Sequence, residues 1–351
     1  MFAVRSALRT KLAPVLLAVA LAATGCGSSD DSKTGTTPTT SPAAELRLGY
    51  FANVTHAGAV YGVASGGFQK ALGSTTLKTS VFNAGPAAIE AMRGGALDAA
   101  FLGPGPAING FSQTKGELLR IVAGTTTGGA SLVVKPSITS VDQLNGKKIA
   151  TPQLGNTQDI AAKAFFKDKG VKPTIINQDN SQTLDTFKAG KIDGGWLPEP
   201  WASRLVLDGG GKVLVDEATL WPGGKFVTTH LVVRQAFLKQ YPATVKALLS
   251  GLIEATDAVG TKSQAVQDVV NGQIEKDTGK KLKPEVLAAA FAKLTPTVDP
   301  AAASLAESAK HAEDIGLLKP TDLKGIYDLS ILNELLKAAG KPEVDDANLG
   351  V

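Results

Sequence analysis

The sequence predicts an α/β protein of two lobes, which are joined by two long strands and followed by a helical tail. Short apolar runs alternate with helical patterns along most of the 351 residues, as is typical of mostly parallel sheets. Segments 93–99 and 191–195 both read as a helix end, an acidic turn and the start of a strand, as expected of matching positions in two similar halves. The apolar runs near 119–135 and 227–234 are long enough to carry the chain between the halves and back.

The N-terminus has the pattern of a secretory leader. Basic residues precede an apolar run at 12–23, which is too short to cross a bilayer comfortably, and Gly25 and Cys26 follow it. This end resembles the lipobox of bacterial lipoproteins, with Ala23 where a leucine is usual. We therefore expect a signal peptide at 1–25, lipidation of Cys26 and a location at the outer face of the cytoplasmic membrane. The alternative is an ordinary signal peptide followed by an incidental cysteine.

Composition limits what the rest of the chain can do. Segment 26–45 is rich in Ser, Thr, Gly and Pro and has no apolar run, which predicts a disordered tether. Cys26 is the single cysteine, so disulfides, zinc clusters and thiol catalysis are excluded from the body, and we expect no cofactor and no metal. The formal net charge of +4 falls to +1 without Arg5, Arg9 and Lys11, a balance that argues against nucleic acid as a partner.

One strand–turn–helix unit occurs twice in succession. Gly85-Pro86 and Gly103-Pro104 each follow a short apolar strand and open a helical run, with Gly near the N-cap and Pro in the first turn. Two strands therefore end side by side beneath two helix N-termini, where open α/β sheets bind ligands and where an anion is favoured. The alternative is that these Gly-Pro pairs are no more than helix starts.

The other elements continue the alternation. Before residue 235 the expected strands and helices are 46–51, 57–72, 76–83, 99–102, 118–124, 131–135, 147–150, 157–169, 173–177, 181–189, 212–215 and 227–234. The pattern after residue 235 is helical. We place one lobe at 46–130 and 229–351 and the other at 131–228, so that the helical tail returns to the first lobe.

Several runs of the sequence resemble one known family. They are LGYFANVTHA, VFNAGPAAIEA, GALDAAFLGPGPAING, RIVAGTTTGGASLVV, ATPQLGNTQD, GKIDGGWLPEPWASRLV and FVTTHLVVR. They look like the sulfonate/nitrate/taurine class of ABC-importer substrate-binding proteins, and most of all like the aliphatic-sulfonate-binding lipoproteins of actinobacterial type. The resemblance covers about residues 46–258 and implies a type II periplasmic-binding-protein fold, which closes on its ligand like a hinge.

The resemblance also implies a ligand site at strand ends of both lobes. The positions that it carries over are Asn53, Thr55, His56, Asn83, Gly85, Pro86, Gly103, Pro104, Thr126, Thr127, Gly128, Gln153, Asn156, Thr157, Trp196 and Glu199. The residues themselves favour an anion, because loops 52–57, 83–86, 103–108, 125–131 and 151–158 contain no Asp, Glu, Lys or Arg. They offer hydroxyls, amides, an imidazole and backbone N–H groups, which can hold an oxyanion without a countercharge.

Some residues near these loops are open to more than one interpretation. His56 is expected in the cleft rather than on a surface loop. Trp196 follows two glycines and is expected to form a cleft wall, whereas Trp201 is expected in the core. Glu199 could bind a cationic end of the ligand, become protonated on closure, or bond backbone N–H groups at the start of the next helix, which we favour. The Lys-rich run 276–283 is interpreted as a solvated helix end.

The sequence thus predicts a lipid-anchored, monomeric binding protein that captures a small organosulfonate and delivers it to an ABC permease, without catalysis. Alternative ligands are taurine, nitrate or a thiamine-pyrimidine precursor. An enzyme of thiamine-pyrimidine synthesis shares the implied fold, but a resemblance to it would require a Cys-rich motif and an internal cofactor lysine, and Cys26 is the lone cysteine. A lipoprotein that feeds a signalling partner is a further alternative.

Overall fold

The computed structural model describes residues 41–351, so the predictions for the leader, for Cys26 and for most of the tether lie outside the described residues. The last residues of the predicted tether are packed instead. Ala43 is buried and its N–H donates to Thr244 Oγ1 over 2.8 Å, and the first strand begins at Glu45. Within residues 41–351, no helix is both long enough and apolar enough to cross a membrane.

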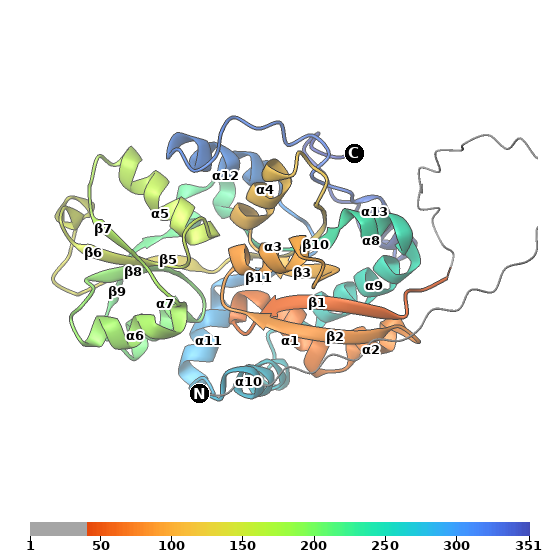
Figure 1. Cartoon of the computed structure of the whole chain (residues 1–351). Helices are drawn as coiled ribbons and strands as arrows, with labels where there is room; N and C mark the ends of the chain where they lie inside the picture. Colours follow the sequence, from red (N-terminus) through yellow and green to blue (C-terminus); the bar gives the residue numbers. More distant parts are fainter. Residues whose placement is uncertain (1–40) are drawn as a thin grey trace, which may run out of the picture. The chain divides into compact units, whose positions relative to one another are not determined.

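Two sheets form the two lobes (Figure 1). The first sheet, in the order β11-β4-β10-β3-β1-β2, contains β1 (Glu45–Phe51), β2 (Thr76–Phe82), β3 (Ala99–Leu102), β4 (Leu119–Gly128), β10 (Val227–Arg234) and β11 (Leu294–Pro296). The second, in the order β7-β6-β8-β5-β9, contains β5 (Ala130–Val134), β6 (Lys148–Thr151), β7 (Thr174–Asn177), β8 (Gly194–Pro198) and β9 (Lys212–Asp216). In the first sheet β1 pairs in parallel with β2 and β3, and in the second sheet β6 pairs in parallel with β7 and β8. β10 in the first sheet and β5 in the second are antiparallel to their neighbours.

Helices cover both sheets. Those of the α/β units are α1 (Ala57–Ala64), α2 (Gly67–Leu72), α3 (Gly85–Arg93), α4 (Pro104–Gln113), α5 (Thr157–Asp168), α6 (Asn180–Lys188) and α7 (Trp201–Leu207). Short 3-10 turns are η1 (Val54–His56), η2 (Val141–Leu144), η3 (Glu217–Leu220) and η4 (Pro222–Gly224). The helix predicted at 57–72 is divided into α1 and α2 because Gly66 has a positive φ of 73°.

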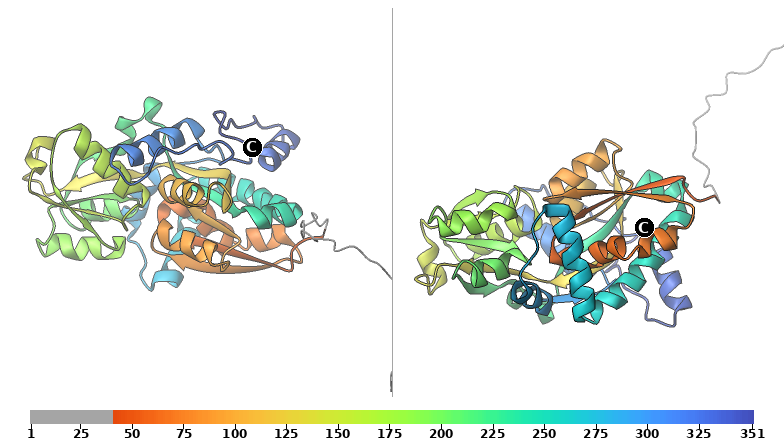
Figure 2. Two further views of the ribbon diagram at one scale, coloured as in Figure 1. Left: turned by 45° about the horizontal axis from the view of Figure 1, so that its top comes forward. Right: turned by 90° about the horizontal axis from the view of Figure 1, so that it is seen from below.

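The helical tail spans both lobes rather than one. It contains α8 (Gln235–Gln240), α9 (Pro242–Gly260), α10 (Gln264–Thr278), α11 (Pro284–Ala292), α12 (Ala302–Asp314) and α13 (Ser330–Ala338). Figure 2 shows the teal and blue helices of the tail beside the orange helices of the first lobe, where α9 and α10 contact α1. However, α11 contacts α7 and α12 contacts α5 of the second lobe, and β11 adds an unpredicted strand beside β4 (Figure 1).

The two lobes repeat one arrangement, as the matching acidic turns in the sequence predicted. Asp98 precedes β3, and its Oδ2 accepts the N–H of Arg47 on β1 over 3.1 Å. Asp193 precedes β8, and its Oδ2 accepts the N–H of Lys148 on β6 over 3.0 Å. In each lobe a carboxylate therefore ties the turn before the third strand to the first strand, and the strand ends that follow are placed in the same way.

The crossing between the lobes occurs at two consecutive glycines. β4 continues through residues 125–128, which the sequence analysis treated as a loop, and β5 begins at Ala130 in the other sheet. Gly128 and Gly129 lie between the sheets with φ values of 77° and 76°, a conformation that favours glycine. The chain returns through η3 and η4, and β10 then lies within the first sheet.

Candidate functional site

A small polar cavity lies where the strand ends of the two lobes meet, with a volume of about 20 Å³. The first lobe contributes Phe51, Asn53, Thr55, His56, Asn83, Gly103 and Thr228, and the second contributes Asn156, Thr157, Gln158, Asn180 and Pro198. These lining residues include no Asp, Glu, Lys or Arg. The cavity is thus surrounded by neutral amides, hydroxyls and one imidazole; we call it the cradle.

Two helix N-termini of the first lobe are closed by side chains of the second. The N–H of Gly85, at the start of α3, donates to Asn156 Oδ1 over 3.4 Å, and the N–H of Gly105, in the first turn of α4, donates to Thr157 Oγ1 over 3.4 Å. Such N–H groups have no partner within their own helix and carry the positive end of its dipole. An added Cβ at Gly103 would lie 2.1 Å from Thr157 Oγ1, so glycine permits this close approach of the lobes.

His56 is a neutral hydrogen-bond donor on the first-lobe side of the cradle. Its ring stacks on Phe51 with centroids 4.2 Å apart, and Nδ1 accepts the Phe51 N–H over 3.3 Å, which leaves the proton on Nε2. Burial lowers the pKa of His56 to about 3. Beside it, Thr55 Oγ1 donates to Asn53 Oδ1 over 2.9 Å, so the NH₂ group of Asn53 remains for another acceptor.

Asn180 lines the cradle from the first turn of α6, although the sequence analysis did not include it. It is only 7% exposed, and its Oδ1 has no hydrogen-bond partner among residues 41–351. Asn180 follows β7 and opens a helix just as Asn156 follows β6, so the same reasoning could have found it. Gln158 also lines the cradle, and its place directly after Thr157 at the start of a helix could have indicated this. Thr228 lies within β10, and the pattern of a strand does not indicate which of its residues border a cavity.

Three predicted site residues on the crossing strand do not reach the cradle. Thr126, Thr127 and Gly128 lie in β4, where they pair with β10 and β11 as part of the first sheet. The Thr- and Gly-rich composition suggested a loop, but the pairing with β11, which comes from the tail, keeps the strand extended. They are not among the lining residues of the cradle, and their part in ligand binding stays a prediction.

Four further predicted residues lie near the cradle but do not line it, and one of them is Gly85, whose N–H donates to the lining residue Asn156. Gln153 is exposed, and its carbonyl accepts the Asn156 N–H over 2.9 Å. Pro86 and Pro104 occupy the first turns of α3 and α4, as the Gly-Pro pattern predicted, and they shape the helix starts without facing the cavity.

The two tryptophans exchange the positions that the sequence predicted. Trp196 is fully buried against Phe165 and Phe166, with ring centroids 5.2 Å and 6.0 Å away, and its Nε1 donates to Glu217 Oε2 over 2.6 Å. The prediction that Trp196 forms a cleft wall is therefore wrong. Trp201, which was expected in the core, is half-buried and lines a larger chamber beside the cradle.

Glu199 turns away from the cradle towards the helix that follows it. Its side chain is 3% exposed, and its Oε2 accepts the backbone N–H of Ser203 in α7 over 3.1 Å. This geometry agrees with the favoured interpretation, although the donor lies further along the helix than expected. Burial raises the pKa of Glu199 to about 7. Its own N–H donates to Gly129 O over 2.8 Å, so Glu199 also braces the crossing between the lobes.

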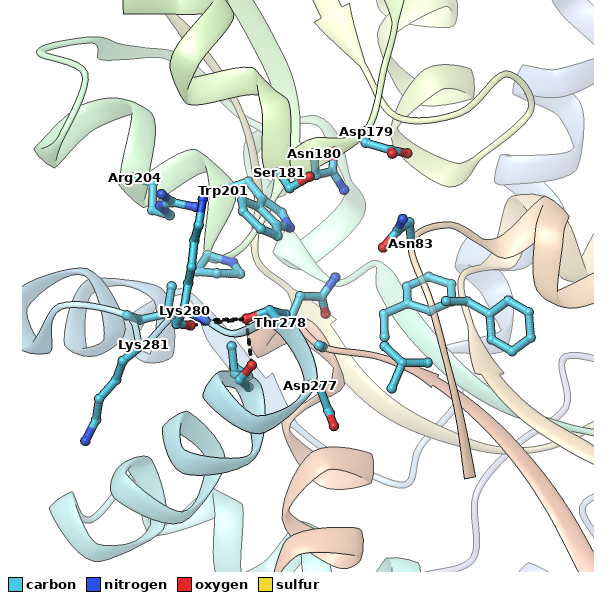
Figure 3. A pocket seen from close by; sticks show the side chains of 18 residues that line it. Asn83, Asp179, Asn180, Ser181, Trp201, Arg204, Asp277, Thr278, Lys280 and Lys281 are labelled. Atoms are coloured by element: carbon cyan, nitrogen blue, oxygen red, sulfur yellow. Dashed lines mark hydrogen bonds between the residues drawn. The ribbon is translucent and has the colours of Figure 1, made fainter. Parts of the chain in front are cut away.

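The larger chamber has a volume of about 620 Å³ and adjoins the cradle (Figure 3). Both hollows share Phe51, Asn53, Asn83 and Asn180. Trp201 and Arg204 of α7 form one further wall, and the loop after α10, which begins within the Lys-rich run, forms another. The run interpreted as a solvated helix end therefore borders a chamber between the lobes.

The model of the NMT1-like family matches residues 39–271, which is more than half of the chain. This chain belongs to the NMT1-like family. Among its relatives, the taurine-binding periplasmic protein of Escherichia coli K12 is 29% identical over 191 residues, which are 54% of this chain and 58% of that protein. A putative aliphatic sulfonates-binding protein of the same organism is 26% identical over 196 residues, again 54% of this chain and 58% of the relative. The chain thus spans less than two thirds of the length of these two family relatives.

Solved structures share the fold of this family member. The alkanesulfonate-binding protein SsuA of Xanthomonas axonopodis pv. citri, bound to MOPS, has a TM-score of 0.66 at 21% identity and covers 80% of this chain and 96% of its own. The periplasmic nitrate-binding protein NrtA of Synechocystis PCC 6803 has a TM-score of 0.68 at 14% identity and covers 85% and 90%. The predicted two-lobed type II fold is confirmed by these structures, and the named relatives belong to the class of binding proteins that the sequence resembles.

Proposed function

We propose that this protein is an extracytoplasmic solute-binding protein that captures a small organosulfonate between its lobes and delivers it to an ABC permease. The observation that carries this proposal is the pairing of Gly85 and Gly105 N–H groups with side-chain oxygens of Asn156 and Thr157. An oxyanion placed in the cradle would present its own oxygens to these same donors. The taurine-binding and sulfonate-binding relatives support this chemistry.

The neutral lining suits a sulfonate in particular. A sulfonate is ionised at physiological pH and has oxygens that only accept hydrogen bonds. The hydrogen-bond donors at the cradle are the Nε2–H of His56, amide groups such as that of Asn53, and the N–H groups at the starts of α3 and α4. Each hydrogen bond to a charged group contributes about 1.5–3 kcal/mol, and a cavity shielded from water strengthens it.

Ligand entry requires the cradle to open. Its volume of about 20 Å³ is roughly that of one water, far less than a sulfonate group needs. The side chains of Asn156 and Thr157 must turn, or the lobes must separate about the crossing at Gly128 and Gly129. The ligand would then act by shifting the population of open and closed forms, and the permease would prefer the closed one. The adjoining chamber supports a ligand with an organic tail rather than nitrate.

We further propose that the protein works as a monomer anchored through a lipid on Cys26, binds without converting its ligand, and uses no cofactor. Both relatives are named as binding proteins, which supports ligand binding without catalysis. Incubation with candidate sulfonates or thiamine-pyrimidine precursors, followed by mass analysis, separates a binder from an enzyme. Recovery of the ligand unchanged is the expected outcome, and a new product would contradict the proposal.

A thermal-shift screen of residues 41–351 tests the ligand class. Ethanesulfonate, taurine, nitrate, sulfate and a thiamine-pyrimidine precursor would be compared. A ligand at 100 times its Kd adds about 2.7 kcal/mol to the free energy of unfolding. We expect a sulfonate to give the largest shift, and stabilisation by nitrate alone would contradict the sulfonate assignment.

A pair of variants on one loop then tests the cradle. Asn156→Ala removes a lining side chain and should weaken sulfonate binding by about 1–3 kcal/mol, because the Asn156 NH₂ group can no longer donate a hydrogen bond to the bound sulfonate. Gln153→Ala, three residues earlier on the exposed side of the loop, is the matched control and should bind as the wild type does. Equal affinities in both variants would show that the ligand binds elsewhere.

A further inference from the structure

The chamber beside the cradle is bounded by apolar surface on the side nearest the strand ends. Phe51, Val81 and Phe82 come from the ends of β1 and β2, and Val81 is 42% exposed. Trp201 of α7, labelled in Figure 3, lines the same chamber from the second lobe. Flat apolar walls on opposite sides favour a ring over a short polar chain, because aromatic groups gain both burial and stacking there.

The far side of the chamber carries an excess of positive charge, because Arg204 shares its one carboxylate partner with Lys283. The guanidinium of Arg204 lies 5.3 Å from the centroid of the Trp201 ring, and its nearest carboxylate, Asp208, is 3.9 Å away. Lys283 already binds that carboxylate over 2.6 Å. Lys280 has no ion-pair partner in the described part of the chain, and Figure 3 shows its side chain extending towards Trp201 and Arg204.

The acidic residues that line the chamber form no ion pair with Lys280 or Arg204 in the described part of the chain. Asp277 keeps its charge but points away from Lys280 (Figure 3), where its carboxylate accepts hydrogen bonds from Tyr50 Oη over 2.7 Å and from Gln273 Nε2 over 2.8 Å. Asp179 lies at the opposite side, next to Asn180 at the start of α6 (Figure 3). Two cations therefore face the chamber next to an aromatic ring, and the chamber meets the cradle at the four uncharged side chains that the two hollows share.

We propose that the ligand is an aromatic sulfonate with a second acidic group. The inference rests on the proposed function and deepens it: the sulfonate occupies the neutral cradle, the ring lies against Trp201 and Phe82, and the second acidic group binds Lys280 and Arg204. A cationic tail, such as the ammonium group of taurine, would meet Lys280 and Arg204 and be repelled. The cradle thus binds the anionic head by neutral donors, and the chamber selects the tail by charge.

The test uses ligands that differ only at the tail. Titration calorimetry would compare ethanesulfonate, benzenesulfonate, para-sulfobenzoate and taurine. We expect benzenesulfonate to bind more tightly than ethanesulfonate, and para-sulfobenzoate to bind about five- to tenfold more tightly than benzenesulfonate, since a partly exposed charge-assisted bond contributes roughly 1 kcal/mol or more. The gain of para-sulfobenzoate should shrink at high salt.

Neighbouring lysines supply the matched variants. Lys280→Gln should bring para-sulfobenzoate to within about twofold of benzenesulfonate and leave benzenesulfonate unchanged. Lys281→Gln is the control, because Figure 3 shows Lys281 pointing away from Trp201 and Arg204, and it should keep the full preference.

The outcomes separate the two proposals. If none of the sulfonates binds, the proposed function fails and this inference fails with it. If ethanesulfonate and benzenesulfonate bind but para-sulfobenzoate gains nothing, or taurine binds most tightly, the assignment of the tail is overturned and the cradle stands. Loss of the preference in Lys281→Gln but not in Lys280→Gln would also overturn it.

Discussion

Replacing Gly103 by alanine should prevent the lobes from closing as far as they do in this structure. An ideal Cβ would lie 2.1 Å from Thr157 Oγ1 and 3.1 Å from Thr157 Cβ, whereas an ordinary contact is 3.4–4 Å. The second lobe would have to withdraw by about 1.3 Å at this point, the difference between 2.1 Å and 3.4 Å, or the Thr157 side chain would have to turn. Either change breaks the hydrogen bond from the Gly105 N–H to Thr157 Oγ1, which is already 3.4 Å long.

The expected effect of Gly103→Ala is on ligand binding rather than on folding. Its φ of −79° and ψ of 169° suit alanine, so the unliganded protein should unfold at nearly the wild-type temperature. With Thr157 held further away, its hydroxyl would no longer donate to the bound sulfonate, and the loss of that charge-assisted hydrogen bond, about 1.5–3 kcal/mol, weakens the Kd for ethanesulfonate by roughly ten- to a hundredfold. Titration calorimetry gives the Kd and scanning calorimetry the unfolding temperature.

The matched control for this substitution is Gly272→Ala. An added Cβ at Gly272 in α10 meets no atom within 4 Å, so this variant should keep wild-type affinity. Wild-type affinity in Gly103→Ala as well would refute the reasoning, because it would show that ligand binding does not need this close approach of Gly103 and Thr157.

Three other substitutions test separate parts of the structure. Burial raises the pKa of Glu217 to about 7 from 4.5, so the wild type should lose stability as the pH rises from 4.5 through 7, by an amount on the order of 3 kcal/mol. Glu217→Gln should remove this loss. If urea unfolding shows that the free energy of unfolding changes equally with pH in both proteins, this prediction is wrong. Glu199→Gln keeps an acceptor for the Ser203 N–H and should change ethanesulfonate and taurine binding equally, whereas a selective loss of taurine would show that Glu199 reads an ammonium group. Cys26→Ala should leave the folded lobes intact but release the protein or leave it unprocessed, and fractionation that finds processed Cys26→Ala still in the membrane would disprove lipidation.

The parts of the fold that local chemistry decides could be predicted from the sequence. The Gly-Pro pairs gave the starts of α3 and α4, and the acidic turns at Asp98 and Asp193 revealed two similar lobes. The neutral character of the cradle followed from the uncharged loops around Asn53 and Asn156. These features depend on a few neighbouring residues, so they can be predicted without knowledge of the tertiary structure.

The features that distant segments decide could not be predicted in this way. Thr126 and its neighbours form strand rather than loop because β11, far along the chain, pairs with them. Trp196 and Leu197 alternate across β8, and only the position of α5 shows that Trp196 faces the core. Lys280 belongs to the Lys-rich run that the sequence pattern indicated as a solvated helix end, and its place at the chamber depends on how α10 packs on the first lobe.

A crystal structure of the protein with ethanesulfonate tests the central claim most directly. We expect sulfonate oxygens about 2.7–3.2 Å from the N–H nitrogens of Gly85 and Gly105, with Asn156 Oδ1 and Thr157 Oγ1 displaced from those donors. A sulfonate bound elsewhere, with both N–H groups still paired to Asn156 and Thr157, would contradict it.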